Sequence, residues 1–249
     1  MNLPHKLVAT GFVALAAITL TGAAILAVAP VKEKVQGPLD KFRFVAFDGF
    51  DGTLGLNWKP VRPDDSHVSL KKNPGKLTIT TQRGTIHAAA NKNGTTPSAK
   101  NIYVIDSPLA KGGDFVVTTC IVDFAPTAGF QQAGLILYDD DDNYLKFVYQ
   151  YDWRNMGGAN LVLLNEQNAV SKASPVPIET TPKRWLRFTK KGNGYEFASS
   201  ADGEQFIAHG VSEWSTGGPK QIGIIAKNGG TPDIPEIDAQ FEFFELKAP

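Results

Sequence analysis

Short apolar runs separated by turn residues recur along most of this chain, and the densest example lies at residues 131–151. There an apolar run over 133–138 meets a polar tip at 139–143, and a second apolar run starts at Tyr144. Two such runs joined by roughly five polar residues predict a β-hairpin. Side chains two positions apart share a face, which puts Leu145, Phe147, Tyr149 and Tyr151 on one side of the second strand and Tyr144, Lys146, Val148 and Gln150 on the other. Neither side is purely polar, so both strands are expected in the middle of a sheet of a two-layer β protein.

The same pattern predicts further strands before and after this hairpin. They are expected at residues 42–46, 56–61, 76–81, 102–105, 115–124, 161–164, 185–189, 195–199, 221–226 and 237–246. Beyond the N-terminus, no long stretch has helical periodicity. About a dozen short strands at a spacing of roughly 8–12 residues predict an all-β fold, namely a two-sheet antiparallel β-sandwich of the jelly-roll type.

Alternation also assigns the faces of the first and last strands. Phe44 and Ala46 should share one face of the first strand, with Val45 on the other. In the last strand one face should hold Ile237, Ala239, Phe241 and Phe243, and the other Glu236, Asp238, Gln240 and Glu242.

The N-terminal segment differs from the rest of the chain. Residues 7–29 carry no charge and form a run long enough to span a bilayer as a helix. Residues 27–29, Ala-Val-Ala, have the form of a cleavage site, but Pro30 directly after them should impede cleavage. The segment is therefore expected to be either a signal peptide or an uncleaved signal anchor, and the folded part should lie outside the cytoplasm, secreted, periplasmic or membrane-anchored. The predicted organisation is 1–29 signal or anchor, 30–41 linker and 42–249 sandwich domain.

Composition narrows the possible functions. The chain has 25 Lys and Arg against 25 Asp and Glu, so no basic field exists to hold nucleic acid. A single cysteine, Cys120, can form neither an internal disulfide nor a metal cluster, and its apolar surroundings predict burial. The four histidines are scattered, so the sequence indicates neither a zinc site nor a serine triad.

Several segments together resemble a known fold family. They are FDGFDGTLGLNW, QQAGLILYDDDDNYLKFVY, KRWLRFTKKGNGYEFASSADGEQF, IGIIAKNGG and FEFFEL. They look like laminin-G-like jelly rolls of concanavalin A-like fold, and within these like an uncharacterised family of exported proteins similar to the C-terminal β-sandwich module of β-xylosidases. The resemblance spans roughly residues 42–246 and implies two curved antiparallel sheets. It says little about activity, because a fold does not determine a function.

The expected face of Glu236, Asp238 and Glu242 is a candidate catalytic site. The strand is similar to the Glu-x-Asp-x-Glu strand of laminarinase-type glycosidases, although Gln240 takes the place of the motif's second Glu. Residues two apart are roughly 7 Å apart along a strand. Rotamers can close that separation to the ~5.5 Å of a retaining glycosidase pair. A solvated strand face would show the same pattern, so the strand does not by itself indicate an enzyme.

A candidate calcium site combines Asp48, Asp51 and Asp238. In laminin-G-like sandwiches the first and last strands often lie side by side, and a calcium ion can join them. Calcium is bound by carboxylate and carbonyl oxygens, which the Asp-Gly turns at 48–49 and 51–52 can present. Ordinary turn chemistry explains the same residues without a metal. The aspartates at 139–142 are a weaker candidate, because adjacent carboxylates repel and favour a solvated hairpin tip.

A candidate glycan site consists of Tyr144, Tyr151, Trp153 and Arg154, on the second hairpin strand and the loop that leaves it. Flat aromatic faces stack on sugar rings, and neighbouring polar groups bind the hydroxyls. Tyr144 and Tyr151 have opposite parity, so one of them should be buried unless a bulge intervenes. Trp153 lies beyond the regular strand, where it either stacks on a sugar or caps the end of the core.

Taken together, these features predict an exported or membrane-anchored carbohydrate-binding domain without catalysis. Its expected partners are a glycan and, if the N-terminal segment is uncleaved, the membrane; its oligomeric state is left open. The alternatives are a glycoside hydrolase that uses the last-strand carboxylates and a purely structural cell-surface module. Two carboxylates in a deep cleft would indicate the enzyme, and aromatic side chains on an open face would indicate the binding protein.

Overall fold

The computed structural model describes residues 41–249 apart from 87–93, 95, 153–156 and 215–216. The chain divides into two units, Met1–Lys32 and Glu33–Pro249, and the described residues all belong to the second. The expected signal or anchor helix and most of the linker lie outside the described residues. Within the described ranges, no helix is long and apolar enough to cross a bilayer.

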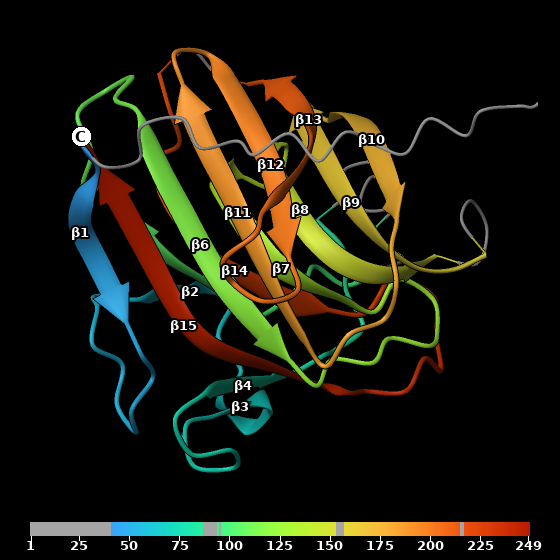
Figure 1. Ribbon diagram of the computed structural model, residues 1–249. Coiled ribbons are helices and arrows are strands. Elements are labelled where there is room, and N and C mark those ends of the chain that lie inside the picture. Colours follow the sequence, from blue (N-terminus) through green and yellow to red (C-terminus); the bar gives the residue numbers. More distant parts are fainter. Residues whose placement is uncertain (1–40, 87–93, 95, 153–156, 215–216) are drawn as a thin grey trace, which may run out of the picture. The chain divides into compact units, whose positions relative to one another are not determined.

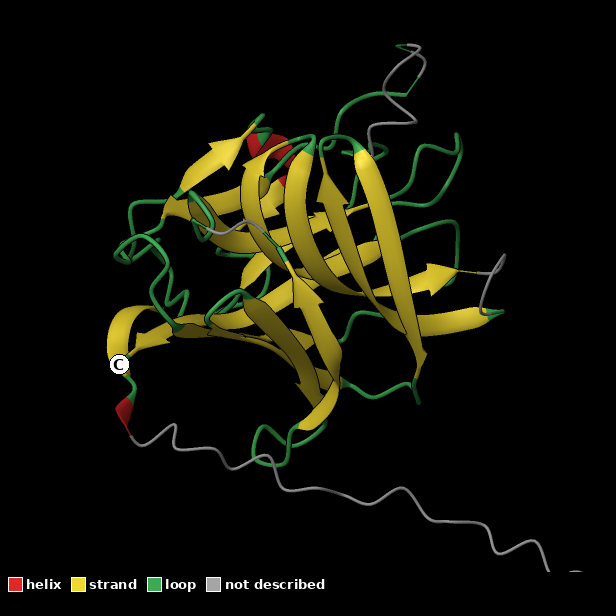
Figure 2. Cartoon of the chain, turned by 90° about the horizontal axis from the view of Figure 1, so that it is seen from above, coloured by secondary structure: helices red, strands yellow, loops and turns green. Residues whose placement is uncertain are grey.

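The described chain is almost entirely strand and loop, as the alternating pattern predicts (Figures 1 and 2). The elements are β1 (Arg43–Asp48), β2 (Lys59–Val61), the 3-10 turn η2 (Asp65–His67), β3 (Val68–Ser69), β4 (Leu77–Thr80), β5 (Ile102–Asp106), β6 (Phe115–Val122), β7 (Gln132–Asp140), β8 (Asn143–Asp152), β9 (Gly158–Gln167), β10 (Val170–Pro177), β11 (Lys183–Lys191), β12 (Gly194–Ser200), β13 (Ile207–Glu213), β14 (Gln221–Lys227) and β15 (Asp238–Ala248). The strands are rich in β-branched and aromatic residues, which fit a pleated, half-buried surface.

The strands form two antiparallel sheets, so the predicted two-sheet sandwich is confirmed. Sheet A is 8-stranded, with the order β13-β12-β11-β6-β15-β4-β3 and with β1 beside β15. Sheet B is 7-stranded, with the order β10-β9-β8-β7-β14-β5-β2. The first and last strands of the domain are neighbours, as the resemblance implied.

Side chains of both sheets meet in one core between them. The hairpin β7–β8 contributes Leu145, Phe147 and Tyr149, while Phe188 and Phe241 come from sheet A. The prediction that Leu145, Phe147 and Tyr149 share one face of the second hairpin strand is therefore confirmed, and that face is the one turned to the core. The outer face of each sheet is the face turned away from this core.

The tip of the hairpin is tighter than the sequence pattern predicts. Asp140 pairs with Asn143, so the turn consists of Asp141 and Asp142 rather than of residues 139–143. The Asp140 carboxylate accepts hydrogen bonds from the Asp142 backbone N–H and the Asn143 Nδ2, both at 2.9 Å. Such local bonding from an aspartate closes a turn, and an apolar–polar pattern does not reveal it.

Two β-bulges reverse the alternation expected near the ends of the domain. The extra residue is Val45 in β1 and Glu242 in β15, as the shifts in register show. A bulge puts two residues opposite one and moves the following side chains to the other face. Phe243 was expected beside Phe241 in the core; it lies instead on the outer face of sheet A, and Phe244 is buried in its place.

The outer face of sheet B is itself buried. A second apolar cluster forms there, in which Ile136, Val148 and Val162 pack with Ile86 and Ala99 from the segment between β4 and β5. The central strands β7 and β8 of sheet B are thus buried on both faces, which explains why they lack a purely polar side. The outer face of sheet A, by contrast, carries exposed aromatic side chains.

The edge strands carry features that disturb regular pairing. In sheet B, the edge strand β2 contains Pro60, and the edge strand β10 contains Pro175 and Pro177. In sheet A, His209 is an extra residue in the edge strand β13, because the register shifts between Phe197 and Ala198 of β12.

Gly223 gives a test of how tightly sheet B is packed. A Cβ at this position of β14 would come within 1.9 Å of the Tyr103 carbonyl oxygen and 2.7 Å of the Val104 Cα. Because that neighbour is backbone, Gly223→Ala is expected to lower the free energy of unfolding by about 3 kcal/mol. A Cβ at Gly158 meets nothing within 4 Å, so Gly158→Ala should change stability by about 0.5 kcal/mol at most. Urea denaturation measures both, and equal midpoints would contradict the packing.

Candidate functional site

Each carboxylate proposed for catalysis has its own partner. Asp238 accepts from Thr80 Oγ1 at 2.8 Å and pairs with Lys72 Nζ at 2.6 Å. Glu242 pairs with Lys183 Nζ at 2.8 Å, and Glu236 Oε2 lies 3.0 Å from His67 Nε2.

These partners work against the chemistry of a general acid. Burial acts to raise the pKa of Asp238 and of Glu242, but the hydrogen bonds from Lys72 and Lys183 outweigh it and hold both pKa values below their ordinary range. A glycosidase acid needs the opposite, a raised pKa. A catalytic role for Glu236, Asp238 and Glu242 stays a prediction to which this geometry lends no support.

Asp48 organises the turn that follows β1. Its buried carboxylate accepts hydrogen bonds from the backbone N–H of Phe50 at 2.9 Å and of Gly55 at 2.8 Å. It also accepts from the indole Nε1 of Trp58 at 2.7 Å. Three donors therefore converge on one carboxylate, and they fix the loop between β1 and β2 against the core.

The proposed calcium ligands have different surroundings from one another. Asp48 binds the three N–H donors, Asp51 is exposed, and Asp238 is paired with Lys72. Within the described ranges, no group of three or more His, Cys, Asp or Glu side chains is arranged to hold a metal ion. The calcium site at Asp48, Asp51 and Asp238 stays a prediction.

The aspartates of the hairpin tip connect it to the rest of the domain. Asp141 forms a bidentate ion pair with Arg62, with both N–O distances at 3.0 Å. It also accepts a hydrogen bond from Tyr138 Oη at 2.8 Å. Asp139 Oδ1 accepts from the Lys220 backbone N–H at 2.7 Å. The tip is therefore bonded to Arg62 and Lys220, whereas the sequence pattern favours a solvated turn.

The proposed glycan residues are dispersed. Tyr144 lies on the outer face of sheet B, fully buried, and its Oη donates to Glu166 Oε2 at 2.9 Å. Tyr151 has the opposite parity and is half-buried, so the expectation that one of the two tyrosines is buried is met by Tyr144. Trp153 and Arg154 lie outside the described residues. The glycan site at these four residues stays a prediction, and Tyr144 offers a ligand no surface in this structure.

A buried polar network occupies the same face of sheet B. Lys146 Nζ donates to Gln132 Oε1 at 2.9 Å, Gln132 Nε2 donates to Gln150 Oε1, and Gln150 Nε2 donates to Asn160 Oδ1 at 3.2 Å. Burial lowers the pKa of Lys146 to about 8, and the negative charge of Glu166 acts in the opposite direction. These side chains hydrogen-bond to one another across three strands. The network therefore stabilises the strand register and is not a binding surface.

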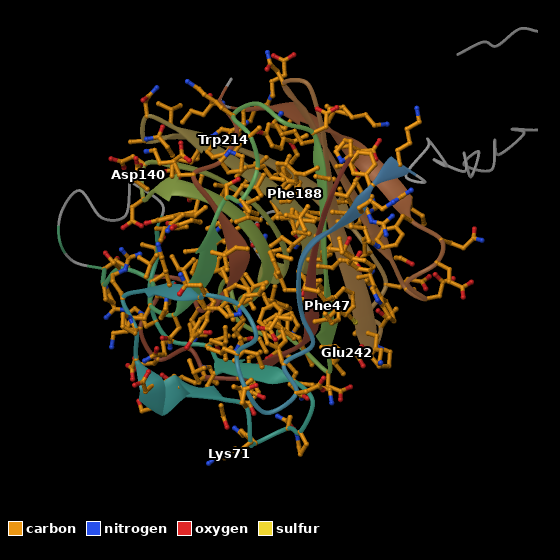
Figure 3. The ribbon with its side chains drawn as sticks, turned by 90° about the vertical axis from the view of Figure 1, so that its left-hand side faces the viewer. Phe47, Lys71, Asp140, Phe188, Trp214 and Glu242 are labelled. Carbon is orange, nitrogen blue, oxygen red and sulfur yellow. The ribbon has the colours of Figure 1, made fainter. Side chains whose placement is uncertain are left out.

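An open aromatic surface lies on the outer face of sheet A. It consists of Phe44 and Phe47 on β1 and Phe243 on β15, and these three residues are the aromatic platform. Figure 3 labels Phe47 within it. Phe44 is 66% exposed and Phe47 is 53% exposed, while Phe243 is partly buried. The rings of Phe47 and Phe243 are nearly parallel, at 19°, with centroids 6.3 Å apart. The ring of Phe44 meets that of Phe47 edge-on at 6.3 Å.

Both bulges are needed for this arrangement. The bulge at Val45 lets Phe44 and Phe47 face the same side although they are three residues apart, and the bulge at Glu242 turns Phe243 to that side. Sequence reasoning missed the platform because it assumed strict alternation. One signal was available: the run FEFFEL has three phenylalanines within four residues, more than one face of a regular strand can bury.

Charged side chains border the platform in matched pairs. Lys247 Nζ lies 4.5 Å from the centroid of the Phe44 ring and 2.7 Å from Glu245 Oε1. Lys183 pairs with Glu242 and lies 5.8 Å from the Trp185 ring. The surface therefore combines apolar rings with hydrogen-bonding groups and little net charge.

A separate pocket lies at one end of the sandwich. Its volume is about 510 Å³, and loops 107–113 and 217–220 line it together with Phe115 and Asp139. Asp139 is already bound to the Lys220 backbone. The pocket holds neither the aromatic platform nor the carboxylates of the last strand.

The two antiparallel sheets packed around one core make this domain a β-sandwich of concanavalin A-like fold. The chain belongs to the family described as protein of unknown function (DUF1349), whose pattern matches residues 64–249. No curated protein matches the chain.

Solved structures agree with the predicted resemblance to the sandwich of β-xylosidases. The GH43 protein BlXynB from Bacillus licheniformis is 26% identical with a TM-score of 0.69, covering 82% of this chain and 39% of its own. A xylan beta-1,4-xylosidase from Bacillus halodurans C-125 is 18% identical with a TM-score of 0.61, covering 81% and 38%. A functionally unknown protein from Saccharomyces cerevisiae is 20% identical with a TM-score of 0.60, covering 78% and 96%. The chain thus spans about two fifths of the GH43 proteins' length. The laminin-G label stays a prediction.

Substitutions at Asp48 and Asp51 test whether these aspartates are structural or bind calcium. Asp48→Ala leaves the buried donors of Phe50 and Trp58 without their acceptor, and it removes the acceptor of the Gly55 N–H. It is therefore expected to lower the free energy of unfolding by about 3 kcal/mol. Asp51→Ala, at an exposed position, should change it by about 0.5 kcal/mol at most. Thermal melts with and without EDTA complete the test. A fall in melting temperature on EDTA treatment, together with a destabilised Asp51→Ala, would support the calcium site instead.

Proposed function

We propose that this domain is a non-catalytic carbohydrate-binding module and that the aromatic platform is its glycan-binding surface. The observation that carries the proposal is the pair of bulges that turn Phe44, Phe47 and Phe243 outward. Bulges that re-aim side chains are frequent beside functional sites. As residues 1–29 predict, the domain acts outside the cytoplasm, secreted or anchored to a membrane.

The chemistry of the platform suits a sugar. Exposed phenylalanine rings lose contact with water when the apolar C–H face of a pyranose covers them, and neighbouring carboxylates and ammonium groups bind its hydroxyls. Glu245 and Lys247 lie beside the rings and can supply those hydrogen bonds. Because Lys247 pairs with Glu245 and Lys183 pairs with Glu242, the platform suits a neutral polysaccharide better than a charged one.

The comparisons support a role with glycans. The GH43 protein BlXynB and the xylan beta-1,4-xylosidase each contain a similar sandwich within a longer chain. The present chain matches about two fifths of their length. A domain that holds a polysaccharide without cleaving it accounts for both the open face and the ion-paired carboxylates of the last strand.

Replacing the platform residues tests the proposal. The variants Phe47→Ala and Phe243→Ala each remove one stacking ring and are expected to weaken binding to soluble xylan about tenfold. Affinity electrophoresis or titration calorimetry on the full-length chain measures the effect. Mannan, as a second neutral polysaccharide, shows how selective the surface is.

Val211→Ala is the matched control. Val211 is an exposed apolar residue of β13, at the far edge of sheet A from the platform. The control should leave binding unchanged, and all variants should keep the melting temperature of the original chain. Unaltered polysaccharide affinity in both phenylalanine variants would remove the platform as the binding surface.

A further inference from the structure

A buried arginine lies between the sheets near the open edge formed by β12 and β13. Arg184, at the start of β11, is 6% exposed and faces the core side of sheet A, because it pairs with the inward residue Ile121. Its Nη2 donates to the Glu179 carbonyl oxygen and to Thr181 Oγ1. Neither acceptor is a carboxylate, and within the described part of the chain the Nε of Arg184 has no hydrogen-bond partner.

This charge cannot be removed by loss of a proton. Burial lowers the pKa of Arg184, yet a guanidinium stays protonated under all ordinary conditions. A buried cation without a counter-ion is strongly unfavourable, whereas a buried lysine can become neutral. Arg184 therefore differs from Lys146 on sheet B, and its environment calls for negative charge.

A second unsatisfied donor faces Arg184 from the other sheet. Tyr149, on β8, is 2% exposed, and its Oη has no hydrogen-bond partner among the described residues. The guanidinium carbon of Arg184 lies 5.5 Å from the centroid of the Tyr149 ring. An acceptor group with two oxygens, such as a carboxylate, can take a hydrogen bond from each of these two donors.

The third feature is a serine–histidine pair at the edge of the same region. Ser199 Oγ lies 2.8 Å from His209 Nε2. The bulge at His209 turns its ring toward Phe147 and Phe197, with centroids 6.2 and 6.3 Å away. Burial lowers the pKa of His209, and the positive charge of Arg184 lowers it further. The half-buried His209 thus senses the charge at Arg184 and lies on an edge strand that solvent reaches.

We propose that Arg184 Nε and Tyr149 Oη bind the carboxylate of a ligand that enters between the two sheets at the β13 edge, beside Ser199 and His209. One carboxylate oxygen accepts from each donor, and the ligand's charge neutralises the guanidinium. The site is separate from the aromatic platform and does not rest on it. The carboxylate belongs either to a sugar acid or to a small free acid.

Ligand-dependent stability of the full-length chain is the first test. Acetate and D-glucuronate are expected to raise the melting temperature, and at a hundred times the dissociation constant they should lower the unfolding equilibrium constant about a hundredfold. D-glucose, without a carboxylate, should have no effect. Glucuronate binding tighter than acetate identifies a sugar acid, and the reverse identifies a small free acid. Stabilisation by inorganic phosphate alone would overturn the carboxylate assignment.

Variants at the two donors show whether binding occurs at this position. Arg184→Met should abolish the stabilisation, and Tyr149→Phe should weaken carboxylate binding about tenfold. Tyr195→Phe is the matched control, because Tyr195 has the other buried tyrosine hydroxyl without a partner in the described residues, and its ring packs against Trp214. If Arg184→Met does not fold, the comparison of the two tyrosine variants decides the question.

The pKa of His209 gives a readout that does not depend on stability. Because the charge of Arg184 lowers this pKa, a carboxylate bound to Arg184 should raise it in the original chain. An NMR titration of the imidazole with and without acetate measures the change, and D-glucose should leave it unaltered. The proposal is overturned if neither carboxylate changes the His209 pKa or the melting temperature of the original chain.

Discussion

The backbone of β15 is the constraint on which sheet A depends. One edge of this strand pairs with β6, and the other edge is shared, first by β4 at Asp238–Phe241 and then by β1 at Phe244–Ala248. Buried N–H and C=O groups need partners, and on this edge the pairing passes from β4 to β1 between Phe241 and Phe244. Glu242 is the extra residue at this change. The same adjustment that completes the ladder turns Phe243 outward and buries Phe244, so hydrogen bonding of the main chain decides which aromatic ring reaches the surface.

The sequence could predict the fold because side-chain alternation is a property of regular strands. It placed Leu145 and Phe147 on the same face, and it identified the hairpin and the two-layer class. It failed where one residue is inserted, since Val45 and Glu242 look like any other strand residues until their partners are known. Tyr144 was assigned the correct parity, but burial of that face involves Ile86 and Ala99, which are distant in sequence. Asp48 was identified as important, although a turn and a calcium ligand require the same residue type.

The outer faces of the two sheets differ in burial. Sheet B is packed on both sides, and its polar side chains bind one another, from Lys146 through Gln132 and Gln150 to Asn160. Such a network favours one register, because a slip of one residue would exchange the two buried sets of side chains. Sheet A has only one packed face, so its outer side can vary without loss of the core. Sheet B thus forms a rigid support for sheet A, whose outer face can carry binding residues.

The edge strands have a consequence for how copies of this domain aggregate. Proline has no N–H to offer, so Pro60 and those at 175 and 177 interrupt the free hydrogen-bonding rows at both ends of sheet B. Sheet A uses a different device, since Val45 and His209 distort the free edges of β1 and β13. Strands from neighbouring molecules need a regular row of donors and acceptors to add to a sheet. The sandwich therefore resists cross-β growth at these edges.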